Sequence, residues 1–195
     1  MEEGRAPDAE VLLRKALHEF RAAGSLDEEG LALSVLIEAL VVQGRLADAR
    51  GTLERADEIS RKTENVHARL RMGIAGARLN AALGKAATAT KKLEALLSLA
   101  EAAGFYGEQL DARLALGGIA MKSGEASAGR ARLEALEAEA DARGYGLIAR
   151  KASAALRATV TPLAGELDSV RGPSAILDSS VARRASPGLY AGRPG

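Results

Sequence analysis

The stretch that decides the fold is Gly44-Arg-Leu46-Ala-Asp-Ala49-Arg-Gly-Thr-Leu53-Glu-Arg-Ala56, because its pattern returns along the chain. Leu53 has counterparts at a constant spacing, and they are Leu13, Leu93 and Leu133. The same interval separates a series of small residues: Ala9, Ala49, Ala89 and Gly129. A fixed period, here of about 40 residues, is the signature of a repeat architecture, in which one supersecondary unit is copied and stacked.

Glycines mark a shorter interval, which is half of this period. They stand at Gly4, Gly24, Gly44, Gly84, Gly104, Gly124 and Gly144. Position 64 holds glutamate instead, and the neighbouring Asn65 is the next most suitable residue for a left-handed helix end. Because apolar residues between these points recur three and four apart, each repeat unit is predicted to be a hairpin of two helices.

The expected architecture is all-α, a right-handed superhelical stack of about eight helices in antiparallel hairpins. Residues 4–158 are assigned to this array. The expected helices are 8–23, 27–43, 46–63, 66–83, 86–103, 107–123, 126–143 and 145–158. A single hairpin cannot bury its apolar face alone, so neighbouring hairpins supply the missing contacts.

Composition excludes several kinds of function. The 195 residues carry a formal net charge of +1, so no field of one sign attracts nucleic acid or an acidic membrane. Cysteine is absent, only two histidines are present, and aromatic residues make up 3%. These numbers argue against thiolate chemistry, a histidine-based metal site and stacking platforms for bases. We therefore expect a cytoplasmic, non-catalytic protein with no cofactor, no bound metal, no nucleic-acid partner and no membrane partner.

The segment 44–56 resembles the second helix of a tetratricopeptide repeat, in which glycine, large, small, large and alanine residues follow at set spacings. Leu116-Gly117, with Ala120 ahead of Gly124, resembles the signature of the first helix of that repeat. The period of this chain exceeds that family's usual length of about 34, and no proline ends the second helices. Despite these two differences, the chain is identified as similar to this family. Its elongated hairpins resemble the type found in large bacterial signalling proteins.

The resemblance implies a concave groove lined by the first helix of each hairpin. Within this groove, charged residues are the candidates for contact with a partner: Glu38, Arg71, Arg78, Asp111 and Lys122. The other implied lining positions are Leu31, Ser34, Val41, Val42, Ile74, Ala81, Ala82, Leu114, Gly118 and Met121. Arg71 and Arg78 are seven positions apart and share one helical face, where they could grip a carboxylate. Alternatively, these arginines pair with Glu38 and Asp111 across neighbouring helices.

Three functions remain open from the sequence, and the one with the least support is an enzyme accessory or a site for a small-molecule effector in the groove. The first is a protein-interaction scaffold that binds a peptide or a helix of another protein in its groove. The second is a structural spacer or self-associating segment of a kinase or transcriptional regulator. No phosphate-binding loop supports catalysis, and the paired Gly117-Gly118 is expected to allow close helix packing.

Residues 159–195 differ from the array in composition. They hold four of the five prolines, and the helical periodicity stops. This composition is typical of a disordered or loosely docked tail. Arg183-Arg184-Ala185-Ser186 resembles a basic-directed phosphorylation site, and whether Ser186 is modified stays open. The first expected helix has the pattern of a second helix, which leaves open whether the chain is a piece of a longer array.

Overall fold

The structure is a computed structural model, and it describes residues 6–158. Within this range the chain forms eight α-helices and no strand. The helices are α1 (Ala6–Ala23), α2 (Leu26–Val42), α3 (Leu46–Lys62), α4 (Val66–Ala82), α5 (Ala86–Ala102), α6 (Tyr106–Lys122), α7 (Ala126–Ala142) and α8 (Gly146–Ala158). The all-α prediction is confirmed, and each expected helix agrees closely with its observed bounds. Gly4, Ser186 and the whole of residues 159–195 lie outside the described part.

Glycine ends six of these helices in the same way. The six residues have positive φ angles between 69° and 90°: Gly24, Gly44, Gly84, Gly104, Gly124 and Gly144. At the end of α2, the amide of Gly44 donates to the carbonyl of Val41 at 3.0 Å, and that of Arg45 donates to Leu40 at 2.9 Å. This pair of bonds satisfies carbonyls that the helix leaves free and turns the chain for the next helix. A left-handed turn residue therefore sets the regular glycine interval.

The turn between α3 and α4 is built differently, and the expectation for Asn65 is wrong. Asn65 has a φ of −68° and caps the start of α4, where its side chain accepts the amide of Ala68 at 3.1 Å. Thr63 before it is extended rather than left-handed. The Asp27 carboxylate on α2 accepts hydrogen bonds from the Thr63 hydroxyl and the Asn65 side chain, and these lower the pKa of Asp27. A side-chain network thus replaces the glycine that is missing at position 64.

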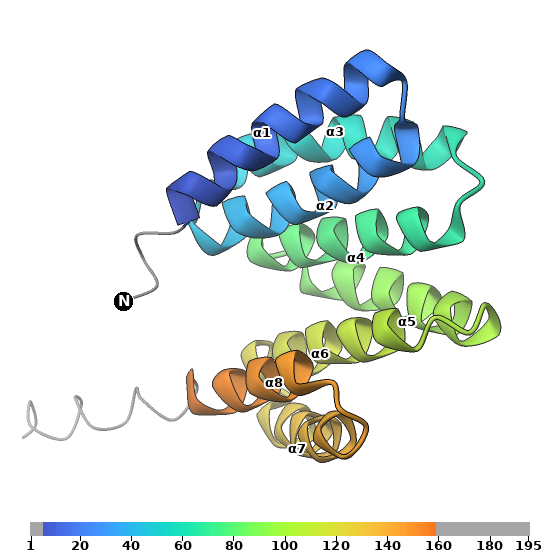
Figure 1. Ribbon diagram of the computed structural model, residues 1–195. Helices are drawn as coiled ribbons and strands as arrows, with labels where there is room; N and C mark the ends of the chain where they lie inside the picture. Colours follow the sequence, from blue (N-terminus) through green and yellow to red (C-terminus); the bar gives the residue numbers. More distant parts are fainter. Residues whose placement is uncertain (1–5, 159–195) are drawn as a thin grey trace, which may run out of the picture. The chain divides into compact units, whose positions relative to one another are not determined.

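The eight helices stack in chain order as two layers (Figure 1). The first helices of the hairpins are α2, α4, α6 and α8, and each contacts the next one directly. The second helices are α1, α3, α5 and α7, and their principal contacts are with the first helices on either side in the chain. This is the arrangement of an α-solenoid, in which each unit contacts only its neighbours.

Small residues at the predicted repeat interval are buried at three described positions: Ala49, Ala89 and Gly129. Ala49 and Ala89 are completely buried, as the pattern predicts. Gly129 on α7 lies against the backbone of α6, so a Cβ atom there would be 2.6 Å from the amide nitrogen of Met121. A Cβ atom at Gly117 on α6 would lie 2.7 Å from the side chain of Leu133. Gly118 beside it has nothing within 4 Å of such an atom, so only the first of the paired glycines permits close packing.

Replacing Gly129 by alanine should destabilise the array, because the added methyl group pushes α7 away from α6. We expect Gly129→Ala to lower the free energy of unfolding by about 1–3 kcal/mol in urea denaturation. Gly51 is the matched control, since it lies within second helix α3 with open space around it. Gly51→Ala should raise stability by about 0.5–1 kcal/mol through helix propensity. Equal effects of the two substitutions would contradict the close approach.

Candidate functional site

Four charged side chains form one connected network across three successive first helices. Arg78 on α4 donates to Glu38 on α2 at 2.6 Å and to Asp111 on α6 at 2.6 Å. Arg71, two turns earlier on α4, donates to the other oxygen of Asp111 at 3.0 Å. The predicted pairing of these arginines with Glu38 and Asp111 is therefore confirmed. We call these four residues the inter-helix charge network.

Burial makes this network more than a set of surface ion pairs. The Asp111 side chain is 5% exposed, and those of Arg78 and Glu38 are 19% and 23% exposed. Burial by itself lowers the pKa of the Arg78 guanidinium, but the Asp111 and Glu38 carboxylates more than offset this and raise it overall. Arg78 thus stays charged, and removing either carboxylate would leave a poorly solvated cation.

The structure changes the expected lining of the groove. Five of the residues expected in the groove are buried instead: Ser34, Ile74, Asp111, Leu114 and Met121. Ser34 is fully buried, and its hydroxyl donates to the carbonyl of Leu31 at 2.7 Å within α2. Lys122 is exposed at the last turn of α6 and does not take part in the inter-helix charge network. The face that remains accessible carries the outer edges of Arg71, Arg78 and Glu38.

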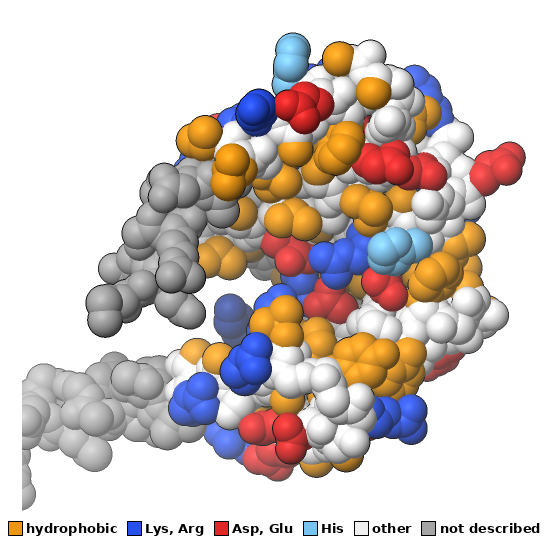
Figure 2. Space-filling view, in the orientation of Figure 1, with side chains coloured by type: hydrophobic (Ala, Val, Ile, Leu, Met, Phe, Trp, Pro, Cys, Tyr) orange, Lys and Arg blue, Asp and Glu red, His pale blue; other side chains and the backbone are white. Residues whose placement is uncertain are grey.

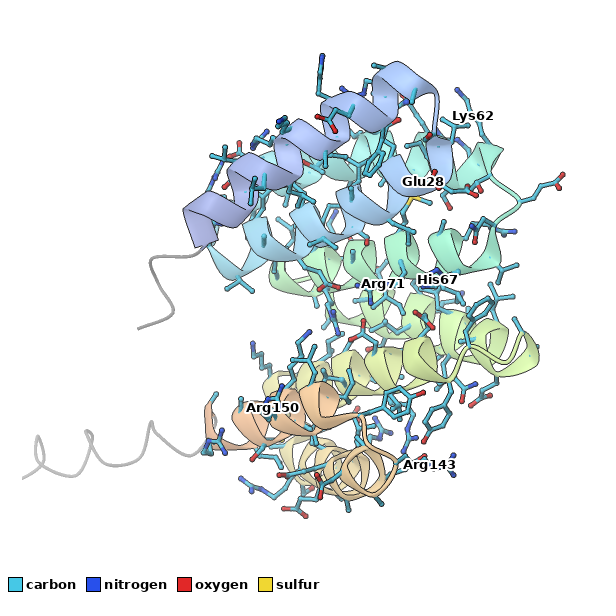
Figure 3. All side chains as sticks on the ribbon, viewed as in Figure 1. Glu28, Lys62, His67, Arg71, Arg143 and Arg150 are labelled. Atoms are coloured by element: carbon cyan, nitrogen blue, oxygen red, sulfur yellow. The ribbon has the colours of Figure 1, made fainter. Side chains whose placement is uncertain are left out.

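A second polar group continues this face toward the start of α6. His67 on α4 lies 3.0 Å from a carboxylate oxygen of Glu108 on α6 and stacks on the ring of Phe105. In Figure 3, His67 and Arg71 extend from neighbouring turns of α4 toward α6. The space-filling view shows acidic and basic side chains together in the hollow at the middle of this face, with hydrophobic side chains around them (Figure 2).

A hollow of about 420 Å³ opens beside the inter-helix charge network. It lies between α4, the first turns of α6 and the turn from α7 to α8. Arg71, Asp111 and Glu108 form its polar side, and Tyr145, Leu147 and Lys151 form the opposite side. Its size is within the range of pockets that hold small ligands or side chains of a partner.

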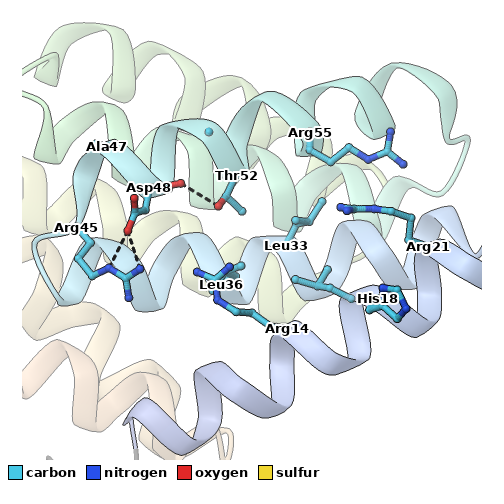
Figure 4. A pocket seen from close by; sticks show the side chains of 12 residues that line it. Arg14, His18, Arg21, Leu33, Leu36, Arg45, Ala47, Asp48, Thr52 and Arg55 are labelled. Atoms are coloured by element: carbon cyan, nitrogen blue, oxygen red, sulfur yellow. Dashed lines mark hydrogen bonds and ion pairs between the residues drawn. The ribbon is translucent and has the colours of Figure 1, made fainter.

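A larger hollow of about 730 Å³ lies between α1 and α3, above α2 (Figure 4). Leu33 and Leu36 of α2 form its floor, and four arginines surround it: Arg14, Arg21, Arg45 and Arg55. Each of these guanidinium groups is paired with a carboxylate, namely that of Glu10, Asp48, Glu29 or Glu58. The charges are therefore already balanced within the protein, and the hollow does not present an excess of positive charge.

Glu29 is the buried member of this outer group, and its side chain is 1% exposed. Arg55 on α3 donates to both of its oxygens at 2.9 and 2.8 Å, and Arg21 on α1 donates to one at 2.9 Å. The hydrogen bonds from Arg55 and Arg21 lower the pKa of Glu29 despite its burial. One carboxylate on α2 thus holds both flanking second helices.

Other classes of site find no support in the described residues. Across 6–158, no group of three or more histidine, aspartate or glutamate side chains is arranged to hold a metal ion. Among the same helices, none combines the length and the apolar character that crossing a bilayer would need.

The order of the helices and their stacked hairpins resemble those of a known family of helical repeats, and the repeat period of this chain is longer than that family's. Residues 1–72 match the family model of the tetratricopeptide repeat. The array is a tetratricopeptide-like helical repeat. No curated protein and no solved structure matches the chain. Tetratricopeptide repeats generally mediate protein–protein interactions, and their all-helical fold is typically not catalytic.

Sequence reasoning missed the far side of the smaller hollow. Lys151 lies one repeat period after Asp111, and Leu147 lies one period after Gly107. Both are therefore in the register of the first-helix face, carried onto α8. Transferring the expected lining pattern to this last helix would have found Lys151 from Asp111, but not Leu147, because Gly107 was not among the expected lining positions. Tyr145 stands just before α8 as Phe105 stands just before α6, one repeat period earlier, and this pair of aromatic residues is the signal that could have found it.

The stability of this array should depend on pH through Glu29. Because its pKa is lowered in the folded state, its contribution is present above its ordinary value of 4.5 and is lost as the pH falls through the folded value. We expect Glu29→Gln to destabilise by about 2 kcal/mol at pH 7 in urea denaturation. The difference in free energy of unfolding between wild type and Glu29→Gln should become smaller below pH 4.5.

The control for this measurement is Glu94→Gln on the exposed side of α5, which should change stability by less than about 0.5 kcal/mol. A difference between wild type and Glu29→Gln that stays constant from pH 7 to pH 3 would contradict the assigned role of the carboxylate.

Proposed function

We propose that the chain is a non-catalytic interaction module that binds a peptide or helix of another protein along its first-helix face. The observation that carries this proposal is the continuous polar strip on α2, α4 and α6, held by the inter-helix charge network. Its arginines are fixed in place before any partner arrives, so binding would require little ordering of their side chains. The outer edges of Arg71, Arg78 and Glu38 are the proposed contacts, together with Lys122.

Asp111 is proposed to position the arginines of this face. Its side chain is nearly fully buried, so it holds Arg71 and Arg78 rather than touching a partner. The module is further proposed to be part of a larger bacterial signalling or regulatory protein, in keeping with the family type that its elongated hairpins resemble.

A selection of random dodecapeptides displayed on phage, with the full chain as bait, would test the proposal. Affinities of the enriched peptides are then measured by fluorescence polarisation. The double variant Arg71→Gln with Lys122→Glu should weaken binding by about tenfold or more, because it removes two cations from the face. Arg78 is left intact because its loss would unpair the buried Asp111 and damage the fold.

The matched control is Arg132→Gln with Lys91→Glu, which makes the same changes at exposed positions of α7 and α5. It should leave affinity within about twofold of wild type, since exposed charges far from a contact contribute little. Failure of any peptide to enrich, or equal affinity for both double variants, would overturn the proposal.

Self-association is the second candidate, and one observation favours it. Val11 and Leu12 are adjacent on α1 and are 68% and 67% exposed, which is unusual for large apolar side chains. A dimer that persists on dilution in sedimentation velocity, and that Val11→Ser with Leu12→Ser dissociates, would support a spacer or oligomerisation role instead.

A further inference from the structure

One side of the hollow beside the inter-helix charge network is aromatic, and contacts with neighbouring side chains position it. Tyr145 lies in the turn before α8, and its ring meets that of Tyr106 edge to face at 5.3 Å. Tyr106 in turn donates its hydroxyl to Glu139 on α7 at 2.6 Å, and the guanidinium of Arg143 lies 4.8 Å from its ring centre. The Tyr145 ring thus packs against a Tyr106 side chain that a hydrogen bond to α7 holds in place, and such preorganisation lowers the cost of binding.

Glycine keeps this hollow open. Gly107, at the second position of α6, has no side chain, whereas its counterparts one repeat period before and after it are His67 and Leu147. A Cβ atom at Gly107 would lie 3.9 Å from the Tyr145 ring, which is an ordinary contact. A larger side chain at this position would therefore enter the hollow without displacing backbone. The helix does not require glycine here, because Gly107 has no positive φ.

The charges around the hollow leave a cation available. Asp111 has two arginine partners, and Glu108 pairs with His67. Within residues 6–158, Lys151 is exposed and takes part in no ion pair. Arg71 uses one of its terminal nitrogens for Asp111, and its side chain is 26% exposed. Both carboxylates of the hollow thus bond to side chains of the protein itself. Lys151 is the cation that remains able to bind an anion, and the exposed part of Arg71 can contribute to that contact.

Leu147 gives the entrance an unusual amount of apolar surface. Its side chain is 57% exposed beside Lys151 on the next turn of α8. Tyrosine and arginine are enriched among the residues that carry most of the binding energy at protein interfaces. The hollow therefore has the composition of an anchor site rather than of a solvated gap between helices.

We propose that this hollow is the anchor pocket for the partner segment, and this rests on the proposed function above. A bulky apolar side chain of the partner lies between Gly107, Tyr145 and Leu147. A carboxylate adjacent to that side chain binds Lys151 and the exposed part of Arg71. The ligand class is therefore a peptide in which a large apolar residue and an acidic residue are neighbours.

The test uses the full chain and the dodecapeptides selected from the phage library. We expect the enriched peptides to share a bulky apolar residue beside aspartate or glutamate. Gly107→Leu should weaken their affinity by at least about tenfold, because the new side chain fills the pocket. Lys151→Gln should weaken it about two- to fivefold, with a smaller effect at high salt.

The matched control is Gly51→Leu on α3, where a side chain also meets open space. It lies on a second helix, outside the first-helix face, and should leave affinity within about twofold. The δ1 methyl group of Ile148, which borders the pocket, gives a direct NMR reporter. Its resonance should move when peptide is added to wild type and stay in place for Gly107→Leu.

Each outcome separates this proposal from the one on which it rests. One outcome would be that peptides bind, but that Gly107→Leu does not change their affinity and the Ile148 resonance does not move. That outcome would overturn the anchor pocket and leave the proposed binding along the first-helix face intact. Failure of every peptide to bind would overturn the proposed function and the pocket together. The absence of cysteine allows one spin label at Ser186→Cys, and broadening of Ile148 by that label would show that residues 159–195 fill the pocket instead. A dependence of the Ile148 resonance on protein concentration would show a second copy there and would also overturn the proposal.

Discussion

Arg78 lies at the centre of the first-helix face, and its guanidinium binds carboxylates from the helix on each side. Glu38 on α2 and Asp111 on α6 come from different hairpins, so one side chain connects three repeats. Arg71 adds a second bond to Asp111 from the same helix. Buried charges are costly unless they are fully paired, so these four residues favour a single spacing between neighbouring hairpins. The position of every other group on the face depends on that spacing.

Close packing on the other side of the first helices complements this network. Gly129 allows the backbones of α6 and α7 to approach closely, and Gly117 makes room for the Leu133 side chain. Ala49 and Ala89 occupy the positions equivalent to Gly129 earlier in the array, and both are buried. Helices of 17 or 18 residues, joined by short turns, account for a period longer than the family's usual length of about 34. Each hairpin therefore presents a longer stretch of first helix, and the face gains room for both the charge network and the pocket at its end.

The sequence was enough to predict the helices and their order, because glycine at a left-handed turn is a local requirement that leaves a regular mark. The sequence did not predict the conformation of Asn65, because the turn there depends on Asp27, which is distant in the chain. Asp27 accepts hydrogen bonds from the side chains of Thr63 and Asn65. The pairing of Arg71 and Arg78 could be foreseen as one of two alternatives, since equivalent positions on neighbouring hairpins lie close together. The burial of Ser34 and Met121 could not be predicted, because it depends on how far each helix is rotated about its own axis.

The geometry of the first-helix face depends on strong coupling between Arg78 and Asp111, and a double-mutant cycle measures that coupling directly. Urea denaturation of wild type, Arg78→Met, Asp111→Asn and the double variant gives the four free energies of unfolding. We expect Arg78→Met alone to lower stability by about 3 kcal/mol, since it leaves a buried carboxylate short of a partner. The coupling energy should reach at least about 1.5 kcal/mol, so that the double variant is less destabilised than the sum of the single ones. Additive effects within about 0.5 kcal/mol would contradict the central role of the network.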